Sequence, residues 1–304
     1  MSQLDGLLLI DKPADVTSHD VVGKVRQIIK QKSVGHTGTL DPLATGLLVL
    51  VLGEATKLSD YLLMADKSYW MKVRLGVTTD SMDRTGKVLS EVNCDLPRET
   101  ILGAVSAAVG EFEWPVPVFS AAKVDGKKLY EYARAGQDVQ IPVKKMKFWG
   151  TQVEEVSGFG VQLHISCSKG SFIRTWADQL GKSLGVGGMI EELRRTRVGH
   201  FDVKQALAVG DLTQDNVSSA FIPMAQALPG WKSIVANPKE NRLIANGQVP
   251  KDLYNRLIFE QKQSFEHQQP VFVKVISGAG DLLAILAAEP GQGLKIRRVF
   301  RTFA

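Results

Sequence analysis

A single carboxylate, Asp41, stands in the glycine-rich segment 33–46, which reads SVGHTGTLDPLATG. Glycine permits backbone conformations closed to other residues, proline biases the residue before it toward an extended conformation, and threonine can hydrogen-bond the backbone. The residues that shape the segment in these ways include Gly35, Thr37, Gly38, Pro42 and Gly46. The pattern predicts a loop that presents Asp41 rigidly, although an Asp-Pro pair is also typical of an ordinary turn.

Three other residues could work with this carboxylate. A carboxylate that attacks or removes a proton must be ionised, and a neighbouring arginine favours the ionised form. Arg174, where the segment SFIRT enters a predicted helix, is the candidate partner. Tyr69 begins a predicted strand and could stack on a planar ring, and His36 could stack on bases or wedge between them. Each also has an ordinary interpretation, as a capping arginine, a core tyrosine and a loop histidine.

The segment 120–149 is strongly basic, with seven cationic residues against three acidic ones. The cationic residues are Lys123, Lys127, Lys128, Arg134, Lys144, Lys145 and Lys147. Tyr130, Tyr132 and Phe148 are interleaved with them. Lysines among aromatic residues are typical of a surface that follows phosphates and stacks on bases. A solvated amphipathic helix and loop would have a similar composition.

Several familiar chemistries lack their motifs. The chain contains no GxxxxGK[ST], no GxGxxG before a helix, no HExxH, no CxxC and no GxSxG. Five scattered histidines and two cysteines offer no metal-ligand spacing. We therefore expect neither a metal nor a cofactor. The formal charge of +5 leans toward an anionic partner. Few cysteines, no membrane-length apolar run and no signal-peptide pattern lead us to expect a cytoplasmic protein.

The elements that must position these residues follow from hydrophobic patterning. Strands are predicted at 6–10, 47–53, 69–80 and 161–167, and helices at 17–29, 97–109 and 173–185. A capping box at Thr17–Asp20 marks one helix start. After Leu228–Gly230 the pattern changes to short strand-like pieces separated by turns, which predicts a small β-rich unit.

Five blocks together resemble the bacterial tRNA pseudouridine-55 synthases of the TruB family. They read GLLLIDKPADVTSHDVV, VGHTGTLDPLATGLLVLVLGEATK, KSYWMKVRLGVTTDSMDRTG, FSAAKVDGKKLYEYARAG and CSKGSFIRTWADQLG, and they span about residues 5–200 in order. The resemblance implies an α+β fold, with a mixed, mostly antiparallel sheet flanked by helices. It also implies a catalytic domain at 1–235, with a T-loop-binding insertion at about 120–149, and a PUA-like RNA-binding domain at 236–304.

The resemblance assigns roles to the candidate residues. It implies that uridine-55 in the T loop of tRNA is flipped out, detached from C1′, turned and rejoined through C5. Asp41 would be the catalytic carboxylate, as a nucleophile or as a base, with Arg174 as its partner. Tyr69 would stack on the flipped uracil and is a candidate base in the later proton transfer. RNA contacts are implied for His36, Lys123, Lys127, Lys128, Tyr130 and Arg134. Lys12, in the DKP block, is expected to be structural, and Phe172 stands where many relatives have tyrosine.

The implied partner is the T arm and elbow of tRNA, without a guide RNA, and we expect a monomer. Three alternatives remain open at the level of sequence. The chain could be a synthase of the same fold with another target uridine, or a tRNA-folding chaperone that has lost catalysis. It could also be a phosphodiester hydrolase that uses Asp41 and a metal.

Overall fold

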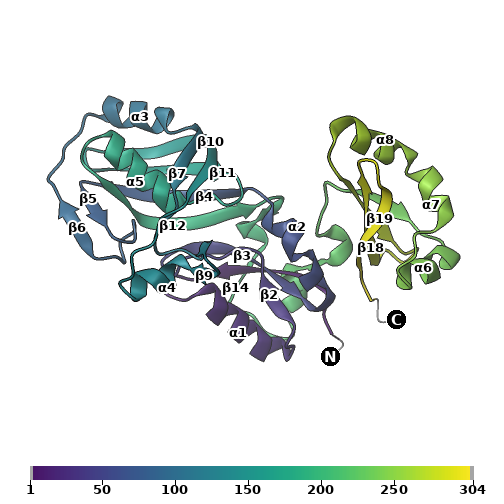
Figure 1. Cartoon of the computed structure of the whole chain (residues 1–304). Helices are drawn as coiled ribbons and strands as arrows, with labels where there is room; N and C mark the ends of the chain where they lie inside the picture. The colour runs from purple at the N-terminus through teal and green to yellow at the C-terminus, as the bar shows by residue number, and fades with distance from the viewer. Residues whose placement is uncertain (1–2, 302–304) are drawn as a thin grey trace.

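The computed structural model describes residues 3–301, which form two units connected near Lys232 (Figure 1). The larger unit is built on an eleven-stranded sheet whose main path has the order β14-β1-β3-β12-β4-β11-β10-β7. Its strands are β1 Gly6–Lys12, β2 Val34–His36, β3 Thr45–Leu52, β4 Lys67–Leu75, β7 Gly110–Pro115, β10 Val143–Ser157, β11 Gly160–Cys167, β12 Gly188–Val198, β13 Phe201–Asp202, β14 Leu207–Ala208 and β15 Phe221–Pro223. Only the β1–β14 and β3–β12 pairs of the described sheet are parallel, so the sheet is mixed and mostly antiparallel, as expected.

Helices cover the large sheet and short elements connect its strands. The helices of this unit are α1 Ser18–Ile29, α2 Ser59–Leu63, α3 Arg98–Ala107, α4 Leu129–Arg134 and α5 Ile173–Ser183. Four 3-10 helices lie at η1 Gly53–Leu58, η2 Val203–Gln205, η3 Val217–Ala220 and η4 Met224–Gln226. The predicted capping box is present at α1, where Thr17 accepts from the backbone of Asp20 and the Asp20 side chain accepts in return.

The central strands show why the sheet has this arrangement. Strand β3 is buried along nearly its whole length, which is typical of a strand covered on both faces. In β4, by contrast, Met71, Val73 and Leu75 are buried while Arg74 is exposed, as the alternation of the sequence predicts. The predicted single strand at 69–80 is wrong in its extent. The chain turns at Gly76, and β5 Val77–Thr79 pairs instead with β6 Val88–Glu91.

The predicted basic segment 120–149 divides in the structure. Its last part, from Val143 onward, belongs to β10 in the large sheet, and Phe148 is fully buried beside Trp114. The interpretation of Phe148 as a base-stacking surface residue is therefore wrong, because strand alternation turns its ring into the core. Residues 116–142, named the basic arm here, contain a hairpin of β8 Lys123–Val124 and β9 Lys127–Lys128, followed by α4.

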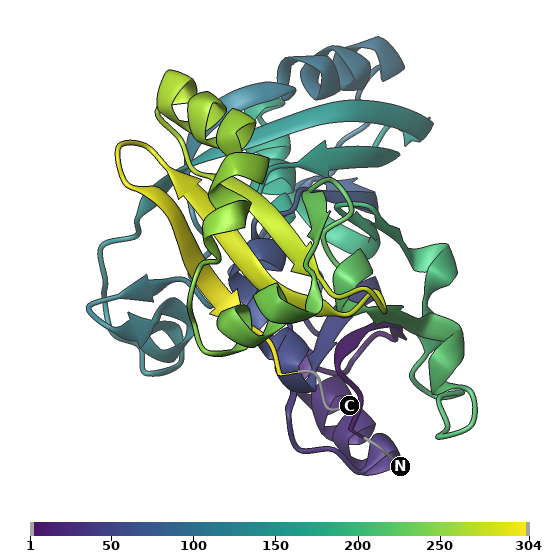
Figure 2. The same ribbon diagram turned by 90° about the vertical axis from the view of Figure 1, so that its right-hand side faces the viewer.

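The C-terminal unit has its own four-stranded sheet and core. Its elements are β16 Lys232–Val235, α6 Pro238–Ala245, α7 Lys251–Arg256, α8 Ile258–His267, β17 Val271–Ile276, β18 Leu282–Glu289 and β19 Gly293–Val299. Figure 2 shows this sheet facing the viewer, with its helices packed on it. The unit is less purely β than the sequence suggested, because three helices connect β16 to β17.

Aromatic and polar contacts join the two units. The ring of Tyr61 lies 5.1 Å from that of Trp231 and 5.5 Å from that of Phe272. Lys57 Nζ donates to the carbonyl of Val299 at 3.0 Å, and Arg301 N donates to Glu54 at 2.8 Å. The C-terminal unit is thus seated against α2 and η1. No helix in residues 3–301 has the length and apolar character needed to cross a membrane.

Candidate active site

Asp41 and Arg174 form a two-pronged ion pair. Arg174 Nε donates to one carboxylate oxygen of Asp41 at 2.8 Å, and Arg174 Nη2 donates to the other at 3.2 Å. The Arg174 side chain is only 5% exposed, whereas that of Asp41 is 34% exposed. Bidentate pairing of this kind fixes orientation as well as charge. The sequence interpretation that Arg174 partners Asp41 therefore agrees with the geometry, and the carboxylate keeps one side open.

Arg174 is itself held by two backbone carbonyls. Nη1 donates to Ser81 O and Nη2 donates to Phe119 O, both at 2.8 Å. Helix α5 carries Arg174 at its second residue, and Phe119 belongs to the basic arm. The arm is therefore connected by a hydrogen bond to the residue that orients Asp41.

Sequence reasoning missed a second carboxylate, Asp83. It is 3% exposed, and one of its oxygens lies 3.7 Å from Arg174 Nε. Its other oxygen accepts from Ser81 Oγ, Thr85 N and Thr85 Oγ1 at 2.6–3.0 Å. The segment DSMDRTG lay within a family-like block, and its clustered acidic, hydroxyl and glycine residues were the available signal.

The backbone around Asp41 is held by buried side chains. Ser18 Oγ accepts from Leu40 N at 2.9 Å and donates to Leu40 O at 3.1 Å. Lys12 Nζ donates to Pro42 O at 3.2 Å, and also to two carbonyls of its own turn. Burial lowers the pKa of Lys12 to about 8, an effect that the nearby carboxylate of Asp41 partly offsets. The structural role expected for Lys12 fits these contacts.

Tyr69 lies in the same pocket as the ion pair. This pocket has a volume of about 150 Å³, and its lining includes Thr39, Asp41, Tyr69, Phe172, Arg174 and Leu193. Pockets that hold drug-sized ligands measure roughly 300–1,000 Å³, so this one suits a single small ring. Burial raises the pKa of Tyr69 to about 12, so its phenol is protonated at neutral pH. Its ring is suited to stacking, and its hydroxyl to donating a hydrogen bond.

His36 lies at the end of β2, opposite Leu50 of β3. Burial and the charge of Arg195 lower the pKa of His36, so the ring is neutral at pH 7. Its Nδ1 is buried, and within residues 3–301 it has no hydrogen-bond partner. His36 is not among the residues that line the small pocket, to which Asp41 and Tyr69 both contribute.

The cationic residues of the basic arm gather around two tyrosines. Lys128 Nζ lies 5.3 Å from the centre of the Tyr130 ring, and Arg134 Cζ lies at the same distance. Lys127 Nζ lies 4.4 Å from the Tyr132 ring. Lys123 and Lys128 also face each other directly across the β8–β9 hairpin.

Like charges in such cross-strand positions are destabilising unless an anion lies between or near them. The four cations of the arm stand against three acidic residues, Asp125, Glu131 and Asp138, so its positive character lies in this local cluster of cations and tyrosines. Its cations are held by the arm itself and do not line the small pocket.

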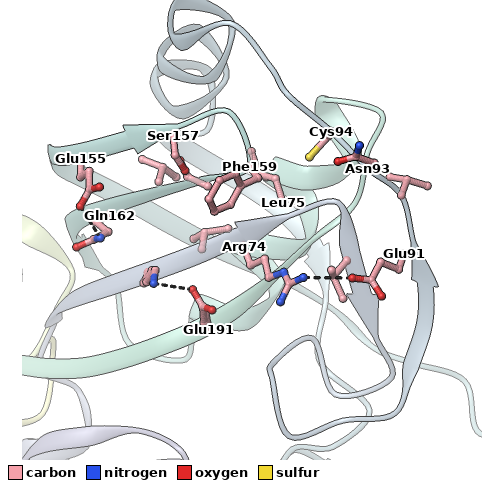
Figure 3. A pocket seen from close by; sticks show the side chains of 16 residues that line it. Arg74, Leu75, Glu91, Asn93, Cys94, Glu155, Ser157, Phe159, Gln162 and Glu191 are labelled. Atoms are coloured by element: carbon pink, nitrogen blue, oxygen red, sulfur yellow. Dashed lines mark hydrogen bonds and ion pairs between the residues drawn. The ribbon is translucent and has the colours of Figure 1, made fainter.

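A larger cavity of about 710 Å³ lies elsewhere, between β4, β11 and β6 (Figure 3). It is on the side of β4 that carries Arg74, which is opposite to Tyr69 by strand alternation. Arg74 already pairs with Glu91 at 3.1 Å, and Lys72 pairs with Glu191 at 3.0 Å. None of the predicted site residues lines it, so the small pocket at Asp41 is the candidate active site.

Comparison with known proteins settles the family. The family model described as TruB family pseudouridylate synthase (N terminal domain) matches residues 26–173, and that of the tRNA pseudouridylate synthase B C-terminal domain matches 174–222. A tRNA pseudouridine synthase B from Bdellovibrio bacteriovorus is 43% identical over 99% of this chain and 98% of its own length. The chain belongs to the TruB family. It is therefore a tRNA pseudouridine synthase, an enzyme that isomerises uridine.

Other relatives agree with this membership. A TruB-family synthase from Clostridium kluyveri is 36% identical over 82% of this chain and 86% of its own length. Among solved structures, a Cbf5-Nop10-Gar1 complex contains a chain of the same fold, with a TM-score of 0.71 and 22% identity over 97% of this chain and 85% of that one. Together the two family models end at residue 222, before the four-stranded unit begins at Lys232.

Proposed function

We propose that this TruB-family enzyme converts uridine-55 in the T loop of tRNA to pseudouridine, with Asp41 as the catalytic carboxylate and without a guide RNA. The observation that carries the proposal is the Asp41–Arg174 pair, because one side of the carboxylate stays open to a pocket sized for one ring. The resemblance of the GHTGTLDPLATG block, and the relatives' printed name, support the choice of tRNA as substrate.

The reaction is an isomerisation, so the substrate and the product contain the same atoms. The C1′–N1 bond breaks, a C1′–C5 bond forms, the C5 proton leaves and a proton is gained at N1. Asp41 serves this exchange either by attacking the sugar or by removing a ribose proton to give a glycal. Both routes use the carboxylate that Arg174 pairs with and orients. Tyr69 stacks on the flipped uracil, and its protonated hydroxyl is a donor rather than a free phenolate base.

Docking of the RNA uses surfaces outside the pocket. The target base must leave its stack because C1′ and C5 are otherwise hidden. Neutral His36 fills the space that the base vacates, and the basic arm clasps the T loop through Lys123, Lys127, Lys128, Tyr130 and Arg134. The C-terminal unit, proposed as a PUA-like domain over 236–304, also contacts the RNA.

We propose a monomer as the working form. We place its work in the cytoplasm, where its proposed tRNA substrate is found. No metal or cofactor has a role in the exchange as written.

The experiment uses an unmodified tRNA transcript tritiated at uridine C5, with EDTA present and no cofactor. Native enzyme is expected to release about one tritium per tRNA, because only C5 of the target loses its proton. Asp41→Asn removes the charge at nearly constant volume, and it is expected to abolish release while tRNA binding stays intact. The matched control is Asp215→Asn, an exposed carboxylate outside the pocket, which should behave as native.

Mapping the product decides the position. Pseudouridine at position 55 supports the proposal, and pseudouridine at another uridine replaces it with a synthase of different target. Absence of tritium release with tight tRNA binding by both proteins would favour a tRNA-folding chaperone. Cleavage of the RNA that requires a divalent ion, seen in a parallel reaction without EDTA, would favour a hydrolase.

A further inference from the structure

Arg195, on β12, is a buried cation that the sequence interpretation passed over within the basic stretch LRRTR. It is 2% exposed and is among the largest fully buried side chains of the protein. Within residues 3–301 no carboxylate lies within 4.0 Å of its guanidinium. Burying a charge without a counter-ion is costly unless every donor finds an acceptor. Its hydrogen bonds therefore indicate what the side chain is for.

The donors of Arg195 end on the backbone of the catalytic loop, residues 37–44 between β2 and β3, and on the backbone of β3 itself. Nε donates to Leu47 O at 2.7 Å, Nη1 to Thr39 O at 3.3 Å and Nη2 to Gly38 O at 3.2 Å. Two of these carbonyls belong to the residues that lead directly into Leu40 and Asp41. The third belongs to Leu47 of β3, the strand that follows the loop. One planar side chain thus fixes the two ends of the loop relative to each other.

The same side chain lies beside Tyr69. Arg195 and Tyr69 are directly opposite each other in the antiparallel β12–β4 pair, so their side chains share one face of the sheet. Tyr69 and Asp41 come from separate parts of the chain, and both line the small pocket. Arg195 contacts the loop of one and is the cross-strand neighbour of the other.

We propose that Arg195 is the positioning residue that sets Asp41 and Tyr69 at the correct separation and orientation for the flipped uridine. The inference rests on the proposed function of Asp41. Ser18 and Lys12 also hold the loop, but they bond Leu40 and Pro42 from the side of α1. Of these three residues, only Arg195 both bonds the loop and lies directly opposite Tyr69, across the β12–β4 pair. Its role is to act through Asp41 and Tyr69, and it does not touch the substrate.

The test compares Arg195→Lys with Arg194→Lys on an otherwise native enzyme. Lysine keeps the charge but cannot bond three separated carbonyls in one plane. Arg194 is the matched control, since it neighbours Arg195 on β12, faces the other side and makes its own two-pronged pair with Asp11. Single-turnover rates are measured at saturating tRNA, together with the Kd for tRNA and the Tm.

Arg195→Lys is expected to lower the single-turnover rate about 100-fold, since a misplacement of roughly 1 Å can cost that much. Its Kd for tRNA should stay within about threefold of native, because phosphate contacts dominate RNA affinity. Arg194→Lys should keep a near-native rate. Combining Arg195→Lys with Tyr69→Phe should cost less than the product of the two single effects, because both act on one arrangement.

Three results would overturn the inference. The first is an unchanged rate for Arg195→Lys, and the second is a loss that Arg194→Lys reproduces. The third is failure of both Arg195→Lys and Arg195→Met to bind tRNA, which assigns Arg195 to folding alone. Native enzyme and Asp41→Asn are run on the same transcript. If native enzyme releases no tritium, the proposed function fails as well, whereas release by native with an unaffected Arg195→Lys removes only this inference.

Discussion

The catalytic loop and the basic arm are built in opposite ways. Each residue from Gly38 to Pro42 has its backbone held by a partner elsewhere or in the following turn, and most of these partners are buried. The basic arm, residues 116–142, consists of two-residue strands and a six-residue helix, and its cations are partly or fully exposed. Its hydrogen bonds run largely between its own residues, with the bond from Arg174 to Phe119 linking it to the site.

The difference follows from what each region must do. Bond exchange at C1′ needs a carboxylate held within a fraction of an ångström, so the loop is made rigid before substrate arrives. A folded RNA must be gripped along its backbone, and exposed cations on short elements can adjust to it. Changes in the loop should therefore affect rate and stability, and changes in the arm should affect affinity.

The largest difference in rate is expected when an arginine is changed to lysine in each region. Arg174→Lys keeps a charge near Asp41 but loses the two-pronged pair and one backbone contact, so kcat should fall about 100- to 1,000-fold. Arg134→Lys, at the exposed end of α4, should change kcat by less than about twofold, since it keeps its charge beside Tyr130. Both values are measured by steady-state tritium release at saturating tRNA. Similar losses for the two variants would contradict the contrast.

A second contrast concerns glycines with positive φ. Gly46 has φ +98°, and a Cβ there would lie 2.3 Å from the backbone oxygen of Arg195, so Gly46→Ala forces β3 and β12 apart. Gly136 has φ +60° and open space around its missing Cβ. The free energy of unfolding should fall by about 3 kcal/mol or more for Gly46→Ala, and by about 1 kcal/mol for Gly136→Ala.

Urea unfolding followed by tryptophan fluorescence measures both values, with native protein as the reference. Equal losses of unfolding free energy in the two variants would show that the clash at Gly46 costs nothing beyond the strain of a positive φ. A Gly46→Ala protein of native stability would place β3 and β12 further apart than the structure has them.

A third contrast separates two lysine clusters of the predicted basic segment. Changing Lys123, Lys127 and Lys128 together to Gln removes three charges, so the slope of log Kd against log salt should decrease by about 2 to 3. Affinity for tRNA at low salt should fall about tenfold or more, with kcat at saturation unchanged.

The matched control is the triple change of Lys144, Lys145 and Lys147 to Gln on β10. Two of these lysines already pair with Glu111, at 2.6 Å and 3.4 Å, so their loss should alter affinity by less than about threefold. Filter binding across a salt series distinguishes the two sets. An equal effect would mean that β10 belongs to the RNA-binding surface after all.

The same comparison shows what could be predicted from sequence. The strands around Asp41 and the capped helix α1 follow from local patterns. The pairing of Asp41 with an arginine followed from the chemical requirement that a catalytic carboxylate be ionised. Arg195 and Asp83 were missed because their importance arises from contacts across many residues, such as Arg195 with Leu47. Phe148 was misplaced because composition does not reveal which face of a strand meets the core.

The smallest contrast is a dependence of the single-turnover rate on pH, which arises from Lys12 at the loop and not from the arm. Burial lowers the pKa of Lys12 to about 8, so its ammonium loses a proton between pH 7 and pH 9. Neutral Lys12 has two hydrogens for the three carbonyls that it now serves, among them Pro42 O beside Asp41. Loss of one such bond should lower the single-turnover rate about two- to fivefold across this range.

Stability should change in the other direction. The unfolded chain binds this proton more tightly than the folded one, so deprotonation of Lys12 contributes stability that grows from pH 8 toward 10.5. Tyr69, whose pKa is raised to about 12, adds no inflection to the rate below pH 9. In Lys12→Met the rate should be lower and flat with pH, while the Kd for tRNA stays constant in both proteins. A native rate that is flat from pH 7 to 9, or a decline that Lys12→Met shares, would remove Lys12 from the control of the loop.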